Sequence, residues 1–249
     1  MPEITMNYFY DQLTDILNTL EEKEMGHIHE AAEIMYETMR KGGVVQVFGS
    51  GHSVGFGMEI TNRAGCLVPI HTMQTSDFVM KGAVSIEEFR SKDVVFERRP
   101  GMADKFFSLY GIKEEDCFII ISNSGINGVV IDTAIKAREE GHKVIILTSW
   151  QHTTAEASRH PSGKKLYEMG HVVIDNCGPQ GDALLQTDGV AKICSISSIT
   201  GAIIAQALVD EVCAMYQRDG LEPPVLWSED VEGYEEHNQE LLKKYEGRI

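Results

Sequence analysis

The clearest signal of the fold is Cys117-Phe118-Ile119-Ile120-Ile121, followed at once by Ser122-Asn123-Ser124-Gly125. A continuous apolar run that ends in small polar residues is typical of a strand buried on both faces of a parallel sheet. Apolar residues then recur at helical spacing from residue 127 to a stop at Gly141, and residues 143–147 predict the next strand. The segment is therefore expected to form a complete strand–helix–strand unit.

The same design occurs earlier in the chain. Apolar residues 44–48 lead into Gly49-Ser50-Gly51-His52-Ser53, and a helix toward residue 63 is expected after this turn. Two more short strands are predicted at residues 67–70 and 172–174. Strands that alternate with helices favour an α/β fold with right-handed crossovers, in which ligands bind at the carboxyl ends of the strands.

Long helices are expected at both ends of the chain. Helical periodicity covers residues 13–39, as one long or two shorter helices, and residues 191–216, whereas residues 71–111 show only short helical pieces. No linker divides the sequence. We therefore predict one domain over residues 1–249, built as a three-layer α-β-α sandwich with a doubly wound, mostly parallel five-stranded sheet and a short acidic C-terminal tail.

Composition and charge exclude several classes of function. The chain has 249 residues, 43% of them hydrophobic, and a net charge of −16, so nucleic acid and anionic membranes would be repelled. No uninterrupted apolar run approaches the ~18 residues of a membrane span, and the first residues do not resemble a signal peptide. A cytoplasmic protein is expected. Its five scattered cysteines predict reduced thiols and neither disulfides nor a zinc site.

Both polar loops lie where a strand turns into a helix. Backbone N–H groups and hydroxyls of 49–53 and 122–127 could therefore point at one anion, such as a phosphate. A local nest of this kind can hold an anion even in an acidic protein. The alternative is a purely structural turn in which Ser50 and Ser53 cap the helix.

A dinucleotide site is a weaker alternative. Gly49, Gly51 and Gly55 form part of a glycine fingerprint, but that pattern is weak by itself. The predicted second strand runs into His71-Thr72 instead of the acidic residue that would hold a ribose hydroxyl.

The two loops together resemble the sugar isomerase (SIS) domain family, whose members bind phosphosugars. The resemblance covers about residues 31–215, and the whole chain looks most like bacterial single-SIS-domain proteins that are often labelled phosphoheptose isomerase-like. It implies the SIS fold, a sugar phosphate ligand and a homodimer. Asn127 stands where the family often has threonine. The residues implied in substrate binding are Gly49, Ser50, Gly51, His52, Ser53, Ser122, Asn123, Ser124, Gly125 and Asn127.

Aldose–ketose isomerisation requires a base beside a carbonyl and an acid for its oxygen. Glu59-Ile60-Thr61-Asn62-Arg63 resembles the segment that carries a catalytic glutamate in phosphoheptose isomerases, although Glu59 could equally pair with Arg63 on the same helix face. Those enzymes also use a histidine on a late helix, and residues 193–216 contain none. His52 in the first loop and His71, expected at the carboxyl end of the second strand, are the candidate replacements.

Three functions fit this sequence. The first is a sugar-phosphate isomerase, the second an etherase or lyase acting on a phosphosugar, and the third a sugar-phosphate sensor without catalysis. No cofactor is predicted, and no residues have metal-ligand spacing, although some heptose isomerases of this type use zinc.

Overall fold

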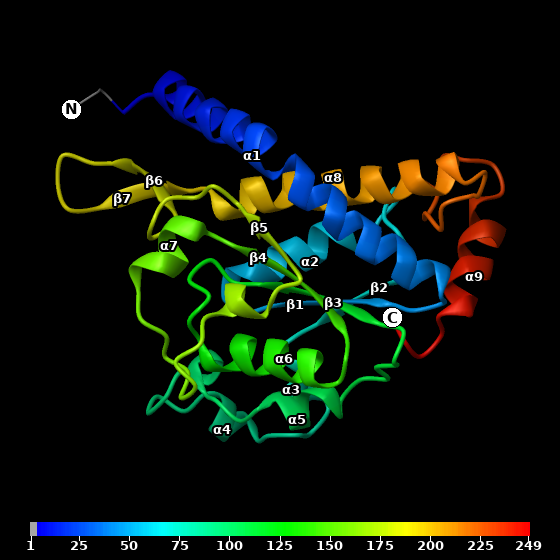
Figure 1. The fold of residues 1–249 in the computed structure, drawn as a ribbon, viewed down its shortest axis with the longest axis horizontal. Helices are drawn as coiled ribbons and strands as arrows, with labels where there is room; N and C mark the ends of the chain where they lie inside the picture. Colours follow the sequence, from blue (N-terminus) through cyan, green and yellow to red (C-terminus); the bar gives the residue numbers. More distant parts are fainter. Residues whose placement is uncertain (1–3) are drawn as a thin grey trace.

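The computed structural model describes residues 4–249 and contains the predicted five-stranded parallel sheet. The strand order is β2-β1-β3-β4-β5, and every neighbouring pair is parallel (Figure 1). All residues of β1 and β3 are buried, as expected for strands covered on both faces. The strands are β1 (Val45–Gly49), β2 (Ile70–Met73), β3 (Cys117–Ile121), β4 (Lys143–Thr148) and β5 (Val172–Asp175).

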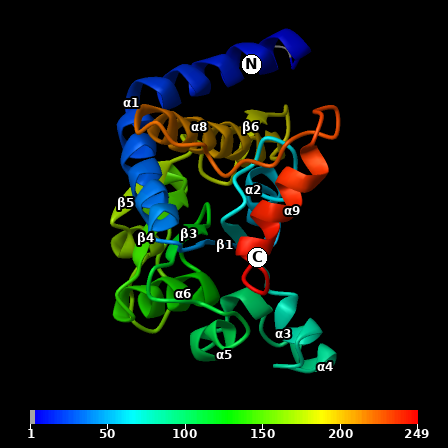
Figure 2. The ribbon, with the colours of Figure 1, turned by 90° about the vertical axis from the view of Figure 1, so that its right-hand side faces the viewer.

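Helices cover both faces of the sheet, which confirms the three-layer architecture (Figures 1 and 2). Alternate strand residues belong to two separate cores: Val47 and Ile119 pack on one side, Phe48 and Ile120 on the other. The first side is covered by α1 (Met6–Arg40), α2 (Val54–Ile60) and α8 (Ser197–Arg218). The second side is covered by α3 (Asp77–Met80), α4 (Ile86–Phe89), α5 (Ala103–Phe107) and α6 (Gly128–Glu139).

The predicted second strand is displaced. The pattern placed it at residues 67–70, but β2 begins only at Ile70. Pro69 has no N–H to donate to a ladder, and Leu67 instead forms an isolated antiparallel bridge with Val225 from the C-terminal region. As a result, His71 pairs with Gln46 near the start of β1 and lies at the amino end of the sheet.

A second correction concerns the segment before α8. The apolar pattern placed a helix from about residue 191, but residues 192–195 form β7, which pairs with β6 (Ala183–Gln186) in an antiparallel hairpin. The remaining elements are α7 (Trp150–Ala155), α9 (Tyr234–Lys244) and three short 3₁₀ helices, η1 (Gly51–Ser53), η2 (Phe96–Arg98) and η3 (Leu166–Met169).

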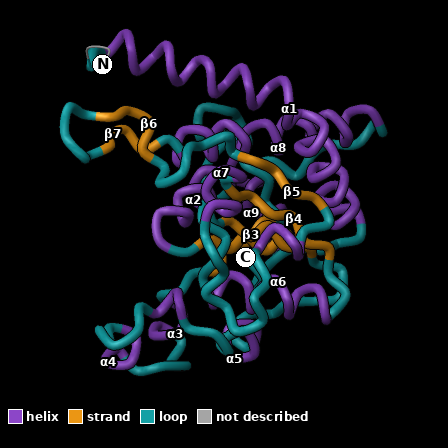
Figure 3. Tube along the Cα trace, turned by 60° about the vertical axis from the view of Figure 1, so that its left-hand side comes forward, coloured by secondary structure: helices purple, strands orange, loops and turns teal. Residues whose placement is uncertain are grey.

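The two long helices α1 and α8 pack together. By length and composition α8 could cross a membrane, but its Ile204 and Leu208 are fully buried in the core against α1 and α2. One continuous helix of 35 residues opens the described chain, and Figure 2 shows it sharply bent. No side chain of residues 6–19 is buried, and this half projects beside the β6–β7 hairpin (Figure 3).

Candidate functional site

A cavity of about 330 Å³ lies where the two polar loops meet. Since β1 and β3 are neighbouring parallel strands, their carboxyl ends place both loops at one edge of the sheet. The cavity contains members of both loops together with residues that come from η2, α7 and the start of α8. Its lining is Ser50, Gly51, His52, Ser53, Glu97, Ser122, Asn123, Ser124, Asn127, His152, Asp182, Ser195, Ser197 and Ser198.

The first loop turns so tightly that it requires glycine at Gly49. A β-carbon there would lie 2.6 Å from the carbonyl oxygen of Ser53. Gly51 adopts a left-handed conformation with a φ of 59°, which leads the chain into η1 and then α2. This geometry directs the polar groups of 50–53 toward the cavity.

The second loop is fixed by its own hydrogen bonds. The Ser122 hydroxyl accepts a hydrogen bond from the backbone N–H of Gly125 at 3.1 Å. Thr148 at the end of β4 donates its hydroxyl to the Ser122 carbonyl at 2.7 Å, and the side-chain amide of Asn176 donates to Asn123 at 2.7 Å. The loop is therefore held in shape without using Ser124.

Three serine hydroxyls of the two loops remain free for a ligand. Within residues 4–249, the side chains of Ser50, Ser53 and Ser124 form no hydrogen bond, although Ser50 is only 8% exposed. Asn127 precedes α6 as its N-cap residue, but its side-chain oxygen accepts from Arg159 at 3.0 Å. The predicted binding residues thus include donors that the fold itself does not consume.

The Asp182 carboxylate forms hydrogen bonds within the protein. Its carboxylate accepts hydrogen bonds from the backbone N–H of Ser197 at 2.8 Å and from the Ser197 hydroxyl at 2.9 Å. A carboxylate at this position accepts hydrogen bonds from the free backbone N–H groups at the N-terminus of the long helix α8. Asp182 therefore positions Ser197 and Ser198 at the cavity.

Two titratable residues of the cavity were missed by the sequence reasoning. A β-carbon on Gly51 would lie 3.6 Å from Oε2 of Glu97, so this carboxylate lies against the first loop. His152 is held through Nε2, 3.3 Å from Glu156, while its Nδ1 is buried and has no hydrogen-bond partner in the described chain. Glu97 comes from the segment with no clear periodicity, so no pattern could have identified it.

The structure does not bring the predicted catalytic residues together in one site. His52 lines the cavity and is exposed. Glu59 is near the C-terminal end of α2, does not line the cavity, and forms an ion pair with Arg63 at 2.8 Å, which is the alternative left open by the sequence.

The predicted position of His71 is wrong. Its Nδ1 lies 2.9 Å from Gln46 Oε1 at the amino end of the strands, and burial lowers its pKa. The displacement of β2 moves this histidine away from the edge that carries the loops. Across residues 4–249, moreover, no three His, Cys, Asp or Glu side chains form a group that could hold a metal ion.

Comparison with known proteins supports the resemblance. The SIS domain family matches residues 8–149. A UPF0309 protein of Geobacillus sp. (strain WCH70) is 34% identical over 243 residues, covering 97% of this chain and 96% of the relative. A UPF0309 protein of Halalkalibacterium halodurans is 37% identical over 232 residues, covering 92% and 93% of the two chains.

Solved structures share the fold. A phosphoheptose isomerase from Francisella tularensis superposes with a TM-score of 0.54 at 18% identity, over 83% of this chain and 95% of that one. A phosphoheptose isomerase from Neisseria gonorrhoeae gives a TM-score of 0.55 at 18% identity, over 84% and 96%. With the family match and the full-length relatives, this likeness leads to one conclusion: the chain belongs to the SIS domain family, and its full-length relatives are UPF0309 proteins.

Proposed function

We propose that the protein binds a sugar phosphate in this cavity and interconverts its aldose and ketose forms. The observation that carries the proposal is the meeting of free serine hydroxyls and a carboxylate in one cavity. Ser50, Ser53 and Ser124 would donate to the phosphate oxygens, and the helix starts after both loops favour negative charge there. The phosphoheptose isomerases of the same fold are consistent with this ligand class.

The proposed base is Glu97, in place of Glu59. In a 1,2-isomerisation, the Glu97 carboxylate would remove the proton from the carbon beside the carbonyl and return it to the neighbouring carbon. His152 would move a proton between the two oxygens, because this residue lines the cavity and its Nδ1 has no hydrogen-bond partner among residues 4–249, while its other nitrogen is held near Glu156. His52, exposed in the first loop, would bind substrate hydroxyls.

The test begins with a thermal-shift screen of sugar phosphates. A ligand present at 100 times its Kd stabilises the protein by about 2.7 kcal/mol, and Ser124→Ala should remove the shift. With the selected sugar phosphate, Glu97→Gln should lower kcat by about 10²–10⁴-fold and leave binding in place.

Glu59→Gln is the matched control and should retain turnover. A Glu97→Gln enzyme with wild-type kcat would refute the assigned base. Tight binding by the wild type without any turnover would favour the sensor, and release of lactate from a lactyl-ether sugar phosphate would favour the etherase.

We also propose that the protein is a homodimer. Phe9, Leu13, Ile16 and Leu17 recur on one face of the α1 segment that buries no side chain. Leu13→Asp with Leu17→Asp should give monomers in light scattering, whereas the exposed Asn18→Asp should not. A wild type that is monomeric at micromolar concentration would contradict the proposal. A cytoplasmic location and the absence of a nucleic-acid partner stay predictions.

A further inference from the structure

A second cavity, of about 520 Å³, lies beside the first. Ser50, Gly51 and Glu97 line both cavities, so a molecule held by the serine loops can extend past these residues into the second space. The rest of its lining comes from Thr75 and from residues 89–97, which lead from α4 into η2. The proposed isomerisation of a small sugar phosphate does not use this space.

Apolar side chains form one wall of the second cavity. Phe96 is 6% exposed and packs against Phe89 with ring centroids 4.6 Å apart and against Phe78 at 5.0 Å. Val95 is 47% exposed and lies next to them on the cavity side. The wall is supported from behind by the core, so it can bury an apolar group without rearrangement.

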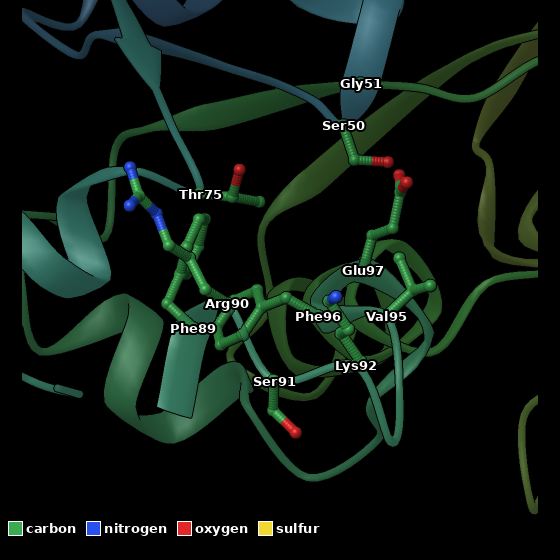
Figure 4. A pocket seen from close by; sticks show the side chains of 10 residues that line it. All are labelled: Ser50, Gly51, Thr75, Phe89, Arg90, Ser91, Lys92, Val95, Phe96 and Glu97. Carbon is green, nitrogen blue, oxygen red and sulfur yellow. The ribbon is translucent and has the colours of Figure 1, made fainter. Parts of the chain in front are cut away.

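Two cationic residues complete the lining. Arg90 and Lys92 are exposed, and neither forms an ion pair with any side chain of the described range 4–249. Figure 4 shows Arg90 at the opposite end of the pocket from Ser50 and Glu97, with Phe89 and Phe96 between. In a chain with a net charge of −16, two cations that line one cavity favour a ligand with a negative end.

We infer that the substrate is a sugar phosphate with a further substituent, apolar in its body and negatively charged at its end, that lies in this second cavity. The inference rests on the proposed function, because the phosphate in the serine loops sets the direction in which the substituent points. The apolar body contacts Phe89, Val95 and Phe96. The charged end lies near Arg90, at the end of the pocket away from Glu97.

A matched series of three ligands tests this assignment. Glucosamine 6-phosphate is the parent; its N-butyryl derivative adds a four-carbon apolar chain, and its N-succinyl derivative adds the same length with a terminal carboxylate. Calorimetric Kd values should decrease from parent to butyryl to succinyl. The double variant Arg90→Ala with Lys92→Ala should weaken the succinyl derivative by about tenfold or more and leave the other two unchanged. Phe89→Ala should weaken both acylated ligands and spare the parent.

The control variant carries the same charge change outside the cavity. Arg98→Ala with Lys105→Ala removes two exposed cations of the same region that do not line this space, and it should bind all three ligands as the wild type does. The inference would be overturned if the wild type bound all three ligands with equal Kd values, or if it bound the two acylated ligands more weakly than the parent. It would also be overturned if Arg90→Ala with Lys92→Ala weakened the binding of all three ligands equally. In those cases, parent binding that is lost in Ser124→Ala would leave the proposed function intact. If folded protein binds none of the three but binds another sugar phosphate of the screen, the inference alone fails; if it binds no sugar phosphate at all, both proposals fail.

Discussion

Replacement of Gly125 by alanine should distort the second serine loop at a calculable cost. Gly125 has a φ of 59°, a region in which an L-residue costs about 1–2 kcal/mol. The added β-carbon would also lie 2.6 Å from Oγ1 of the fully buried Thr153. Overpacking of this kind costs about 1–3 kcal/mol, so the free energy of unfolding should fall by about 2–5 kcal/mol in total.

Urea denaturation separates the two costs with a matched variant. Gly141 has a φ of 88° and no atom within 4 Å of its built β-carbon, so Gly141→Ala should lose only the conformational 1–2 kcal/mol. Thr153→Ala removes the clashing hydroxyl. In a double-mutant cycle it should therefore recover part of the loss in Gly125→Ala.

Ligand binding supplies an independent readout. The backbone N–H of Gly125 donates to the Ser122 hydroxyl, so a displaced Gly125 should also weaken sugar phosphate binding, while Gly141→Ala should not. Equal destabilisation by Gly125→Ala and Gly141→Ala, together with no coupling to Thr153→Ala, would refute the steric argument.

Three further outcomes are expected. The side chain of Asp116 is fully buried and forms an ion pair with Arg248 at 2.5 Å. Asp116→Asn should therefore lower the free energy of unfolding, measured in urea, by about 3–5 kcal/mol. A loss of less than about 1 kcal/mol would contradict the claim that this ion pair is buried. Burial, with the charge of a nearby lysine, lowers the pKa of His71 below its ordinary value of 6.5. As the pH falls below 6.5, the unfolded chain therefore protonates this histidine before the folded protein does, and the free energy of unfolding decreases. His71→Gln should make this pH dependence shallower, and an unchanged slope would contradict it. Burial raises the pKa of the Cys117 thiol to about 12, so iodoacetamide at pH 8 should alkylate the exposed Cys194 and leave Cys117 unmodified in peptide mass spectrometry.

The amino-terminal boundary of β2 shows where local pattern was insufficient. The apolar residues before Ile70 resemble a strand, but Pro69 interrupts the ladder and Leu67 pairs with a segment more than 150 residues away in the chain. A shift of three residues was enough to place His71 at the opposite edge of the sheet. The β6–β7 hairpin was missed because its strands are short and largely exposed.

The sequence by itself determined the sheet and both serine loops. Apolar runs that end in Ser, Asn and Gly specify buried parallel strands, and parallel strands carry their carboxyl ends to one edge. Only the tertiary structure brought Glu97 and His152 to that edge and assigned Glu59 to an ion pair with Arg63. The physical reason is that periodicity reports which face of an element is buried, whereas proximity between distant segments depends on register and packing over the whole chain.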